Sequence, residues 1–234
     1  MNNIEFLGLF FACIILMLLI IKTYSWLGLN IAKGRSVSLS VCAYNLGCYF
    51  VQPKIAQIKG IEIHPDYKPL GTYHNKTGII TLDNSSAYSS SVLGHEVLLH
   101  EAGHALQQED GYHFYALMNF FHSVSYVSIF GIAGSFCYAF AVQTTLSTIL
   151  CIFFMVLLVI SKIAEVPIEL DATRRALELA RELSIYTDED IIYMKKALKA
   201  AAFTYIASGL ELLLLVIILL IASISKGKTN TRRV

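Results

Sequence analysis

Charged residues are scarce in this chain of 234 residues: 15% are Asp, Glu, Lys or Arg, whereas 56% are hydrophobic and the mean hydropathy is +0.60. This balance excludes an ordinary soluble globular domain and is typical of a membrane protein. An excess of one sign of charge is also lacking, because 18 basic residues are balanced by 17 acidic ones. The chain therefore has no broad basic surface, and we expect no nucleic-acid partner.

The five cysteines include no CxxC pair and are scattered along the chain. The missing pair excludes a zinc ribbon, and the position of several cysteines in apolar runs argues against a disulfide framework. We interpret them as small buried hydrophobic residues in a reducing setting.

Long uncharged runs predict four membrane-spanning helices. The first run covers residues 6–21 and is followed by an aromatic flank of the kind found at membrane interfaces. Residues 124–160 are interrupted only by a polar stretch at 143–145, so we expect two spans joined by a very short turn. Residues 203–224 supply the fourth span.

The distribution of Lys and Arg predicts which loops are cytoplasmic. Seven of these residues lie between the first and second spans, seven between the third and fourth, and four in the tail after the last span. The positive-inside rule therefore places both polar loops in the cytoplasm. The basic tail conflicts with this orientation unless the last segment is re-entrant.

Local patterns predict the elements of the first loop. Residues 61–64 and 79–82 have the composition of strands, and the turn-forming residues 75–78 lie between them, so we expect a small hairpin or edge strand. A serine-rich connector at 85–91 leads to the proline-free run 92–108, which predicts a helix.

In the second loop, Pro167 suits either the first turn of a helix or a kink at the end of the third span. Residues 169–183 are expected to be helical. Thr187 with Asp190 three residues later resembles an N-terminal helix cap, and the helix that it opens is expected to continue into the fourth span.

The sequence His100-Glu101-Ala102-Gly103-His104 carries the strongest chemical signal. Four residues advance a helix by about 400°, so the two imidazoles are offset by only about 40° and can reach one zinc ion. Glu101 lies about 100° around the helix, where it misses the metal but can reach a water molecule as a general base. Gly103, which has no side chain, allows another segment or a substrate to approach closely. The alternative is a pair of helical histidines that contact acids near the membrane surface.

A catalytic zinc ion usually has three protein ligands, so a third residue must join the two histidines. Three acids just after the third span lie on the same predicted side of the membrane as the HExxH helix: Glu165, Glu169 and Asp171. Glu178 and Glu182 belong to a run of alternating charges that is typical of a solvated helix face. The residue pattern leaves the choice among the first three acids open.

Three blocks of sequence together resemble a known family. HEAGHALQ at 100–107 is followed by VPIELDATRRAL at 166–177 and AAAFTY at 200–205. In order and spacing these blocks resemble the YugP-type family of bacterial membrane zinc metallopeptidases, which are gluzincin-like. Two stretches depart from the family pattern: residues 94–99 are more polar and residues 71–75 are less acidic.

The resemblance implies that Glu169 completes a Zn²⁺ site with His100 and His104. It also implies peptide-bond hydrolysis in which Glu101 takes a proton from a metal-activated water molecule, and it places Thr173 where related proteases carry an aspartate. The implied location is the bacterial plasma membrane, with a multi-pass chain, a catalytic site on the cytoplasmic side, and a peptide or membrane protein as substrate.

We therefore expect a mainly α-helical, four-span membrane protein with a small cytoplasmic zincin-like α+β portion. The expected segments are a first span in 1–26, the zincin-like portion in 27–113, the second and third spans in 114–163, a cytoplasmic helical segment in 164–202, and the fourth span with its tail in 203–234. A non-catalytic, zinc-stabilised membrane scaffold or adaptor is the alternative. Transport is less favoured, because Glu211 is the main ionisable residue within the spans.

Four further residues have two readings each. His95 should point away from the metal as a hydrogen-bonded histidine, although it remains a possible ligand. Glu96 either orients His100 or is a helix-start acid stabilised by the helix dipole. Asp171 either holds a ligating histidine or pairs with Arg175. His74 either stabilises an oxyanion or is a surface histidine.

Overall fold

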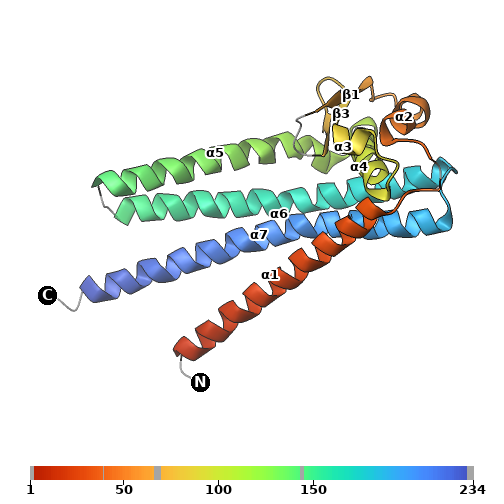
Figure 1. The fold of residues 1–234 in the computed structure, drawn as a ribbon. Coiled ribbons are helices and arrows are strands. Elements are labelled where there is room, and N and C mark those ends of the chain that lie inside the picture. Colours follow the sequence, from red (N-terminus) through yellow and green to blue (C-terminus); the bar gives the residue numbers. More distant parts are fainter. Residues whose placement is uncertain (1–2, 39, 66–69, 143–144, 231–234) are drawn as a thin grey trace. The chain divides into compact units, whose positions relative to one another are not determined.

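The structure is a computed structural model that describes residues 3–38, 40–65, 70–142 and 145–230 (Figure 1). About 75% of the chain is helical, as expected for a mainly α-helical protein. The long helices are α1 (Asn3–Gly34), α4 (Val92–Glu109), α5 (His113–Val142), α6 (Thr145–Glu182) and α7 (Asp188–Asn230). The short elements are α2 (Ala43–Leu46), the π-helix η1 (Gly47–Val51), the 3-10 helix η2 (Gln52–Lys54), the strands β1 (Gly60–His64), β2 (Gly71–His74) and β3 (Ile79–Asp83), and α3 (Asn84–Ala87).

These elements form two compact units. We call the first the helical unit; it comprises Met1–Ile21, Met118–Val166 and Tyr205–Val234. The second, called the mixed unit, comprises Lys22–Leu117 and Pro167–Thr204 and contains the three strands. The boundary between the units in α6 lies next to Pro167, so this one helix contributes its first part to the helical unit and its second part to the mixed unit.

Within the helical unit, α5 and α6 pack closely against each other. A Cβ atom added to Gly131 would lie 2.4 Å from the ring of Phe154, so the missing side chain makes room for that ring. Nearby, the hydroxyl oxygens of Ser125 and Ser161 are 2.7 Å apart and share a buried hydrogen bond. Gly131 therefore serves the packing of these two helices.

Two helices are long and apolar enough to cross a membrane, within the part of the chain that the structure describes. They are Ile15–Gly34 in α1 and Ile149–Glu182 in α6, with hydropathies of 1.6 and 2.5. Only 17% and 28% of their apolar windows are buried, which differs from the core helix of a soluble protein. These two stretches overlap the expected first and third spans. The arrangement with four spans stays a prediction.

In the mixed unit, the three strands form a sheet with the order β1-β3-β2. β2 is antiparallel to β3, and the turn at 75–78 joins them, with Gly78 at φ +71°. β1 is parallel to β3, with Gly60 opposite Ile79. The expectation of a hairpin around this turn is correct, but its first strand is β2 and not residues 61–64. The short polar sequence of β2 carries little strand signal.

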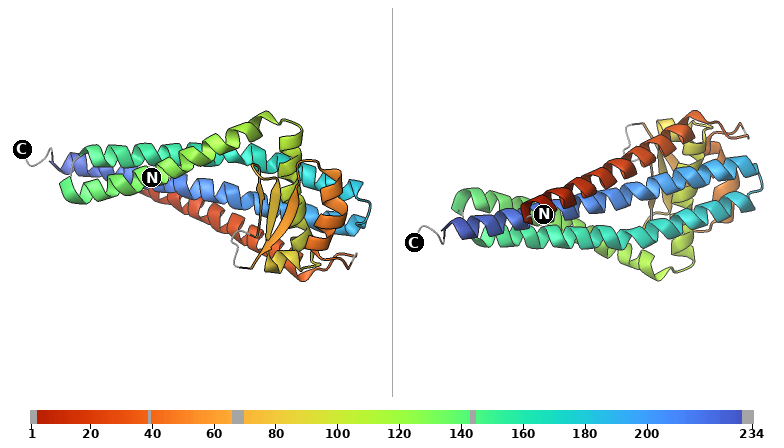
Figure 2. Two further views of the ribbon diagram at one scale, coloured as in Figure 1. Left: turned by 90° about the horizontal axis from the view of Figure 1, so that it is seen from above. Right: turned by 90° about the horizontal axis from the view of Figure 1, so that it is seen from below.

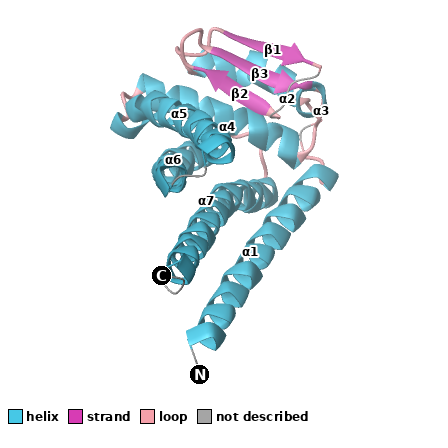
Figure 3. Cartoon of the chain, turned by 90° about the vertical axis from the view of Figure 1, so that its left-hand side faces the viewer, coloured by secondary structure: helices cyan, strands magenta, loops and turns pink. Residues whose placement is uncertain are grey.

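α4 covers one face of this sheet (Figures 2 and 3), and η1 contacts β1 and α4. That face of the sheet is apolar. Its side chains alternate with polar ones along each strand, and Ile80 and Leu82 are fully buried. A Cβ atom at Gly47 would lie 2.3 Å from the side chain of Ile61 in β1 and 3.1 Å from that of Leu98 in α4, so η1 packs tightly against both elements. The sheet thereby fixes the face of α4 that points away from α6.

The predicted helices of the mixed unit are present, with one correction. α4 begins and ends within one residue of the expected range 92–108. Pro167 does not open a new helix, because α6 runs through it without a break. Thr187 and Asp190 form the expected cap: Thr187 N–H donates to the Asp190 carboxylate at 3.0 Å, and Asp190 N–H donates to the Thr187 hydroxyl at 3.2 Å.

α4 approaches the backbone of α6 closely at Gly103. A Cβ atom at this position would lie 2.4 Å from the carbonyl oxygen of Ala172 and 3.1 Å from its carbonyl carbon. Since both atoms belong to the backbone, neither can turn aside as a flexible side chain would. Gly103 therefore allows another segment to approach closely, and that segment is α6.

We predict that Gly103→Ala lowers the free energy of unfolding by about 1–3 kcal/mol, because the clash outweighs the better helix propensity of alanine. The measurement is the thermal unfolding midpoint in detergent without metal. Gly34→Ala is the matched control, since a Cβ atom there meets nothing within 4 Å. A Gly103→Ala midpoint equal to or above that of wild type would contradict this account of the helix crossing.

Candidate metal centre

His100 and His104 lie one above the other on α4, with ring centroids 4.9 Å apart. Glu169 comes from α6, two residues after Pro167. Its Oε2 atom is 3.0 Å from His100 Nε2 and 3.7 Å from His104 Nε2. One ligand atom from each of the three residues lies within 4.8 Å of the others, so the structure brings together the residues expected to bind zinc.

The spacing of these atoms fits a zinc ion. Zn–N and Zn–O distances of about 2.0–2.1 Å in a tetrahedral site place neighbouring ligand atoms about 3.3 Å apart. The two nitrogen-to-oxygen distances, 3.0 and 3.7 Å, lie on either side of that value. The side chains are only 9–16% exposed, so the donor set is shielded but still open to solvent.

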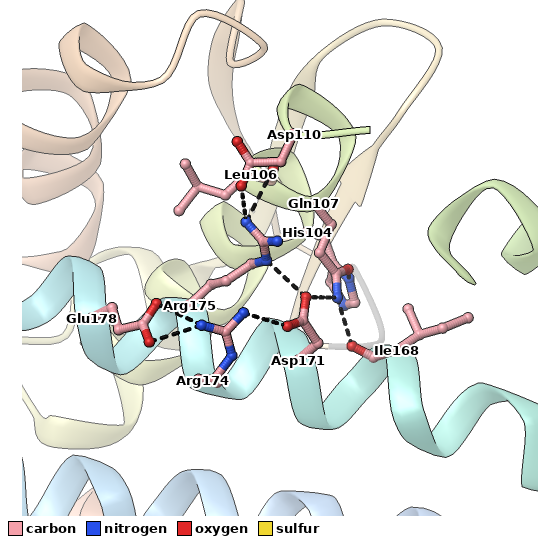
Figure 4. A network of polar contacts seen from close by, with 9 residues as sticks. All are labelled: His104, Leu106, Gln107, Asp110, Ile168, Asp171, Arg174, Arg175 and Glu178. Atoms are coloured by element: carbon pink, nitrogen blue, oxygen red, sulfur yellow. Dashed lines mark hydrogen bonds and ion pairs between the residues drawn. The ribbon is translucent and has the colours of Figure 1, made fainter. Parts of the chain in front are cut away.

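Gln107 determines which nitrogen of His104 carries the proton (Figure 4). Its amide nitrogen donates to the Ile168 carbonyl at 2.8 Å and to Asp171 Oδ2 at 3.0 Å. Because these partners accept only, the amide oxygen must be the atom that faces His104 Nδ1, at 2.9 Å. Nδ1 therefore donates a proton to Gln107, so Nε2, which faces Glu169, is the nitrogen that must lose its proton to bind a metal.

Asp171 stabilises this arrangement through a network of ion pairs (Figure 4). Besides Gln107, its carboxylate accepts from Arg175 Nε at 2.7 Å and from Arg174 Nη2 at 2.7 Å. Arg175 also bonds to Asp110 near the end of α4. Both readings of Asp171 hold in part: it pairs with Arg175 directly, and it orients His104 through Gln107.

Glu101 is held by the edge strand of the sheet. Its Oε2 atom accepts a hydrogen bond from the backbone N–H of Tyr73 at 2.7 Å. The Tyr73 hydroxyl donates to Gln108 Oε1 at 2.8 Å, so β2 is fastened to α4 at two points. The carboxylate expected to act as general base therefore has a fixed position on the same helix as the two histidines.

Burial and charge act in opposite directions on His104. Burial by itself would lower the pKa of its imidazole, but the hydrogen bond and the negative charge of Glu169 raise the pKa to about 9. Burial raises the pKa of Glu96, one turn ahead of His100, to about 7, although the charge of His100 partly opposes this. The metal-free site thus holds a proton on His104 at neutral pH.

The other sequence candidates lie apart from this cluster. Glu165 belongs to the helical unit, where it pairs with Lys162 at 2.8 Å. His95 is fully buried and donates from Nε2 to the Val41 carbonyl at 2.7 Å, so it is the hydrogen-bonded histidine that was expected. His74 contacts Thr81 at 3.1 Å, on the sheet face opposite to α4.

Two contributors, Gln107 and Tyr73, were not predicted as site residues. Gln107 had a usable signal, since it lies three residues after His104 and therefore on the same helix face. Tyr73 had none, because it acts through its backbone amide.

We predict that Gln107→Met weakens zinc binding by about 10- to 100-fold, because His104 loses the partner that fixes its tautomer. The measurement is competition against a zinc chelator of known affinity. Gln108→Met is the matched control, since Gln108 bonds to β2 and not to a histidine. Equal zinc affinities for the Gln107 variant and wild type would refute the orienting role.

Zinc loading is predicted to release a proton from His104, because the metal needs the neutral imidazole. Because the pKa of His104 in the folded protein is about 9, zinc binding should release close to one proton from this residue at pH 7.5. The release disappears above pH 9, so zinc affinity should rise between pH 7.5 and pH 9. Calorimetry in two buffers of different ionisation enthalpy measures the number of protons released per zinc ion bound. Glu169→Gln should reduce the release per bound zinc, whereas Glu178→Gln, at an exposed position of α6, should not.

Comparison with known proteins supports this chemistry. No curated protein and no solved structure matches the chain. A protein-family model described as "putative neutral zinc metallopeptidase" matches residues 9–224, which is most of the chain, in agreement with the family resemblance of its sequence blocks. Membership implies Zn²⁺ as the cofactor. With a match of this length, the chain belongs to the zinc metallopeptidase family that this model describes.

Proposed function

We propose that this protein is a membrane-embedded zinc metalloprotease that hydrolyses peptide bonds. The observation that carries the proposal is the convergence of His100, His104 and Glu169, whose ligand atoms lie within 4.8 Å of one another. These three residues would hold the Zn²⁺ ion that the family implies. Two histidines and one glutamate leave one position open in a tetrahedral site, as catalytic zinc requires.

When bound, zinc would supply Lewis-acid chemistry, which activates water and polarises a carbonyl group. Glu101 then takes a proton from the attacking water molecule and delivers it to the leaving amine. The Tyr73 amide holds its Oε2 atom at 2.7 Å, so Oε1 remains as the oxygen that receives the proton. Gln107 keeps His104 Nδ1 protonated, so Nε2 of that ring is the nitrogen available to hold the ion.

We further propose that the chain crosses the plasma membrane four times and that the site lies on the cytoplasmic side. The scarcity of charge, the two long apolar helices with low burial, and the 14 basic residues in the two loops support this arrangement. The substrate would be a peptide or a membrane protein that reaches the site close to the bilayer.

We predict that Glu101→Gln lowers the rate of peptide hydrolysis by at least about 10²- to 10⁴-fold while the protein keeps its zinc, because the amide cannot accept the proton. Glu169→Ala should lower the zinc content itself. The measurements are metal analysis of the purified proteins and a casein-type cleavage assay with and without chelator. Glu178→Gln removes a carboxylate from an exposed position of the same α6 helix and should change neither quantity.

Two outcomes would contradict the proposal. Cleavage by Glu101→Gln at the wild-type rate would remove Glu101 as the base. One equivalent of bound zinc without any chelator-sensitive cleavage by wild type would favour the zinc-stabilised scaffold instead.

A further inference from the structure

The two histidines of the metal centre differ in how their second ring nitrogen is satisfied. His104 Nδ1 bonds to Gln107 at 2.9 Å. His100 Nδ1 is buried and has no hydrogen-bond partner, although the Nε2 atom of the same ring contacts Glu169. A buried donor without an acceptor costs free energy, and histidines that bind metal almost always donate their other N–H to a carboxylate, carbonyl or water.

Glu96 is the acid one helical turn before His100 on α4. It lies four residues before His100, so the two side chains share one face of α4 with an offset of about 40°. Side chains on a helix lean toward its N-terminus, which directs the His100 ring back toward Glu96. The charge of His100 also acts on the Glu96 carboxylate in the metal-free structure.

The surroundings of Glu96 exclude the reading as a helix-start acid. α4 begins at Val92, and its N-terminus is capped by the Ser91 hydroxyl, which accepts from Gly94 N–H at 3.2 Å. Glu96 lies beyond the first turn and is only 4% exposed. Among the residues that the structure describes, none donates a hydrogen bond to the Glu96 carboxylate. A buried carboxylate in such a position is costly for folding unless another charge compensates it.

We propose that Glu96 is a positioning residue for the metal centre: in the zinc-loaded protein its carboxylate accepts the Nδ1–H proton of His100. The bond fixes the His100 tautomer with the Nε2 lone pair toward the metal, as Gln107 does for His104. Glu96 and Glu169 together would balance the two positive charges of the ion. This inference rests on the proposed zinc site but not on peptide hydrolysis.

The test compares Glu96→Leu and Glu96→Gln with wild type in the full-length protein. Glu96→Leu removes the acceptor and should weaken zinc binding by about 10- to 100-fold, measured by chelator competition. The same variant should raise the unfolding midpoint of the metal-free protein by about 2–4 °C, since it removes a buried carboxylate. Glu96→Gln retains an acceptor oxygen and should recover most of the zinc affinity.

The opposite directions of these two effects separate a positioning role from a structural one. A residue that only supports folding would lower the midpoint and the zinc affinity together. Glu109→Gln is the matched control, because it removes one negative charge from the exposed end of the same helix. Nitrogen NMR of the zinc-loaded protein adds a direct readout: the His100 Nδ1–H signal should be protected from exchange in wild type and lost in Glu96→Leu.

The outcomes separate the role of Glu96 from the proposed peptidase activity. Equal zinc affinities of Glu96→Leu and wild type overturn the role of Glu96, whether or not wild type cleaves casein. Weakened binding in Glu96→Leu with restored binding in Glu96→Gln supports the role, even if wild type has no peptidase activity. A wild-type protein that binds no zinc overturns both proposals.

Discussion

The ligand set of the candidate metal centre is divided between two helices, and everything else in the mixed unit depends on how closely their backbones approach. Both histidines belong to α4, whereas Glu169 belongs to α6. The absence of a side chain at Gly103 lets the Ala172 carbonyl occupy the space where a Cβ atom would be. A wider separation of the two backbones would move Glu169 away from both imidazoles, which it now approaches to 3.0 and 3.7 Å.

Hydrogen bonds hold the two helices at that separation and orient the site at the same time. Gln107 on α4 bonds to Ile168 and Asp171 on α6 through its amide nitrogen and to His104 through its oxygen. Each of these groups is largely buried, so a broken bond would leave an unpaired polar atom. The contacts that stabilise the helix crossing are therefore the same contacts that select the histidine tautomer.

The sequence predicts those features that depend on periodicity within one element. Helical spacing places His100 and His104 on one face, and the capping pair Thr187 and Asp190 locates the start of α7. It fails where the decisive contact is not local. The polar strand β2 is stabilised by pairing with β3 and by its bonds to α4. Pro167 lies inside α6, so of its two local readings, a helix start or a kink, the helix start is wrong.

The bond between Tyr73 and Glu101 also has a consequence for the behaviour of the sheet. β2 is an edge strand, and an edge strand with free N–H groups can recruit a strand from another chain and seed aggregation. Since β2 pairs with β3 on its other side, the Tyr73 amide is one of its few outward donors, and Glu101 already occupies it. Any foreign strand that docks at this position must first displace that carboxylate, so the residue proposed for chemistry also protects the molecule against edge-to-edge association.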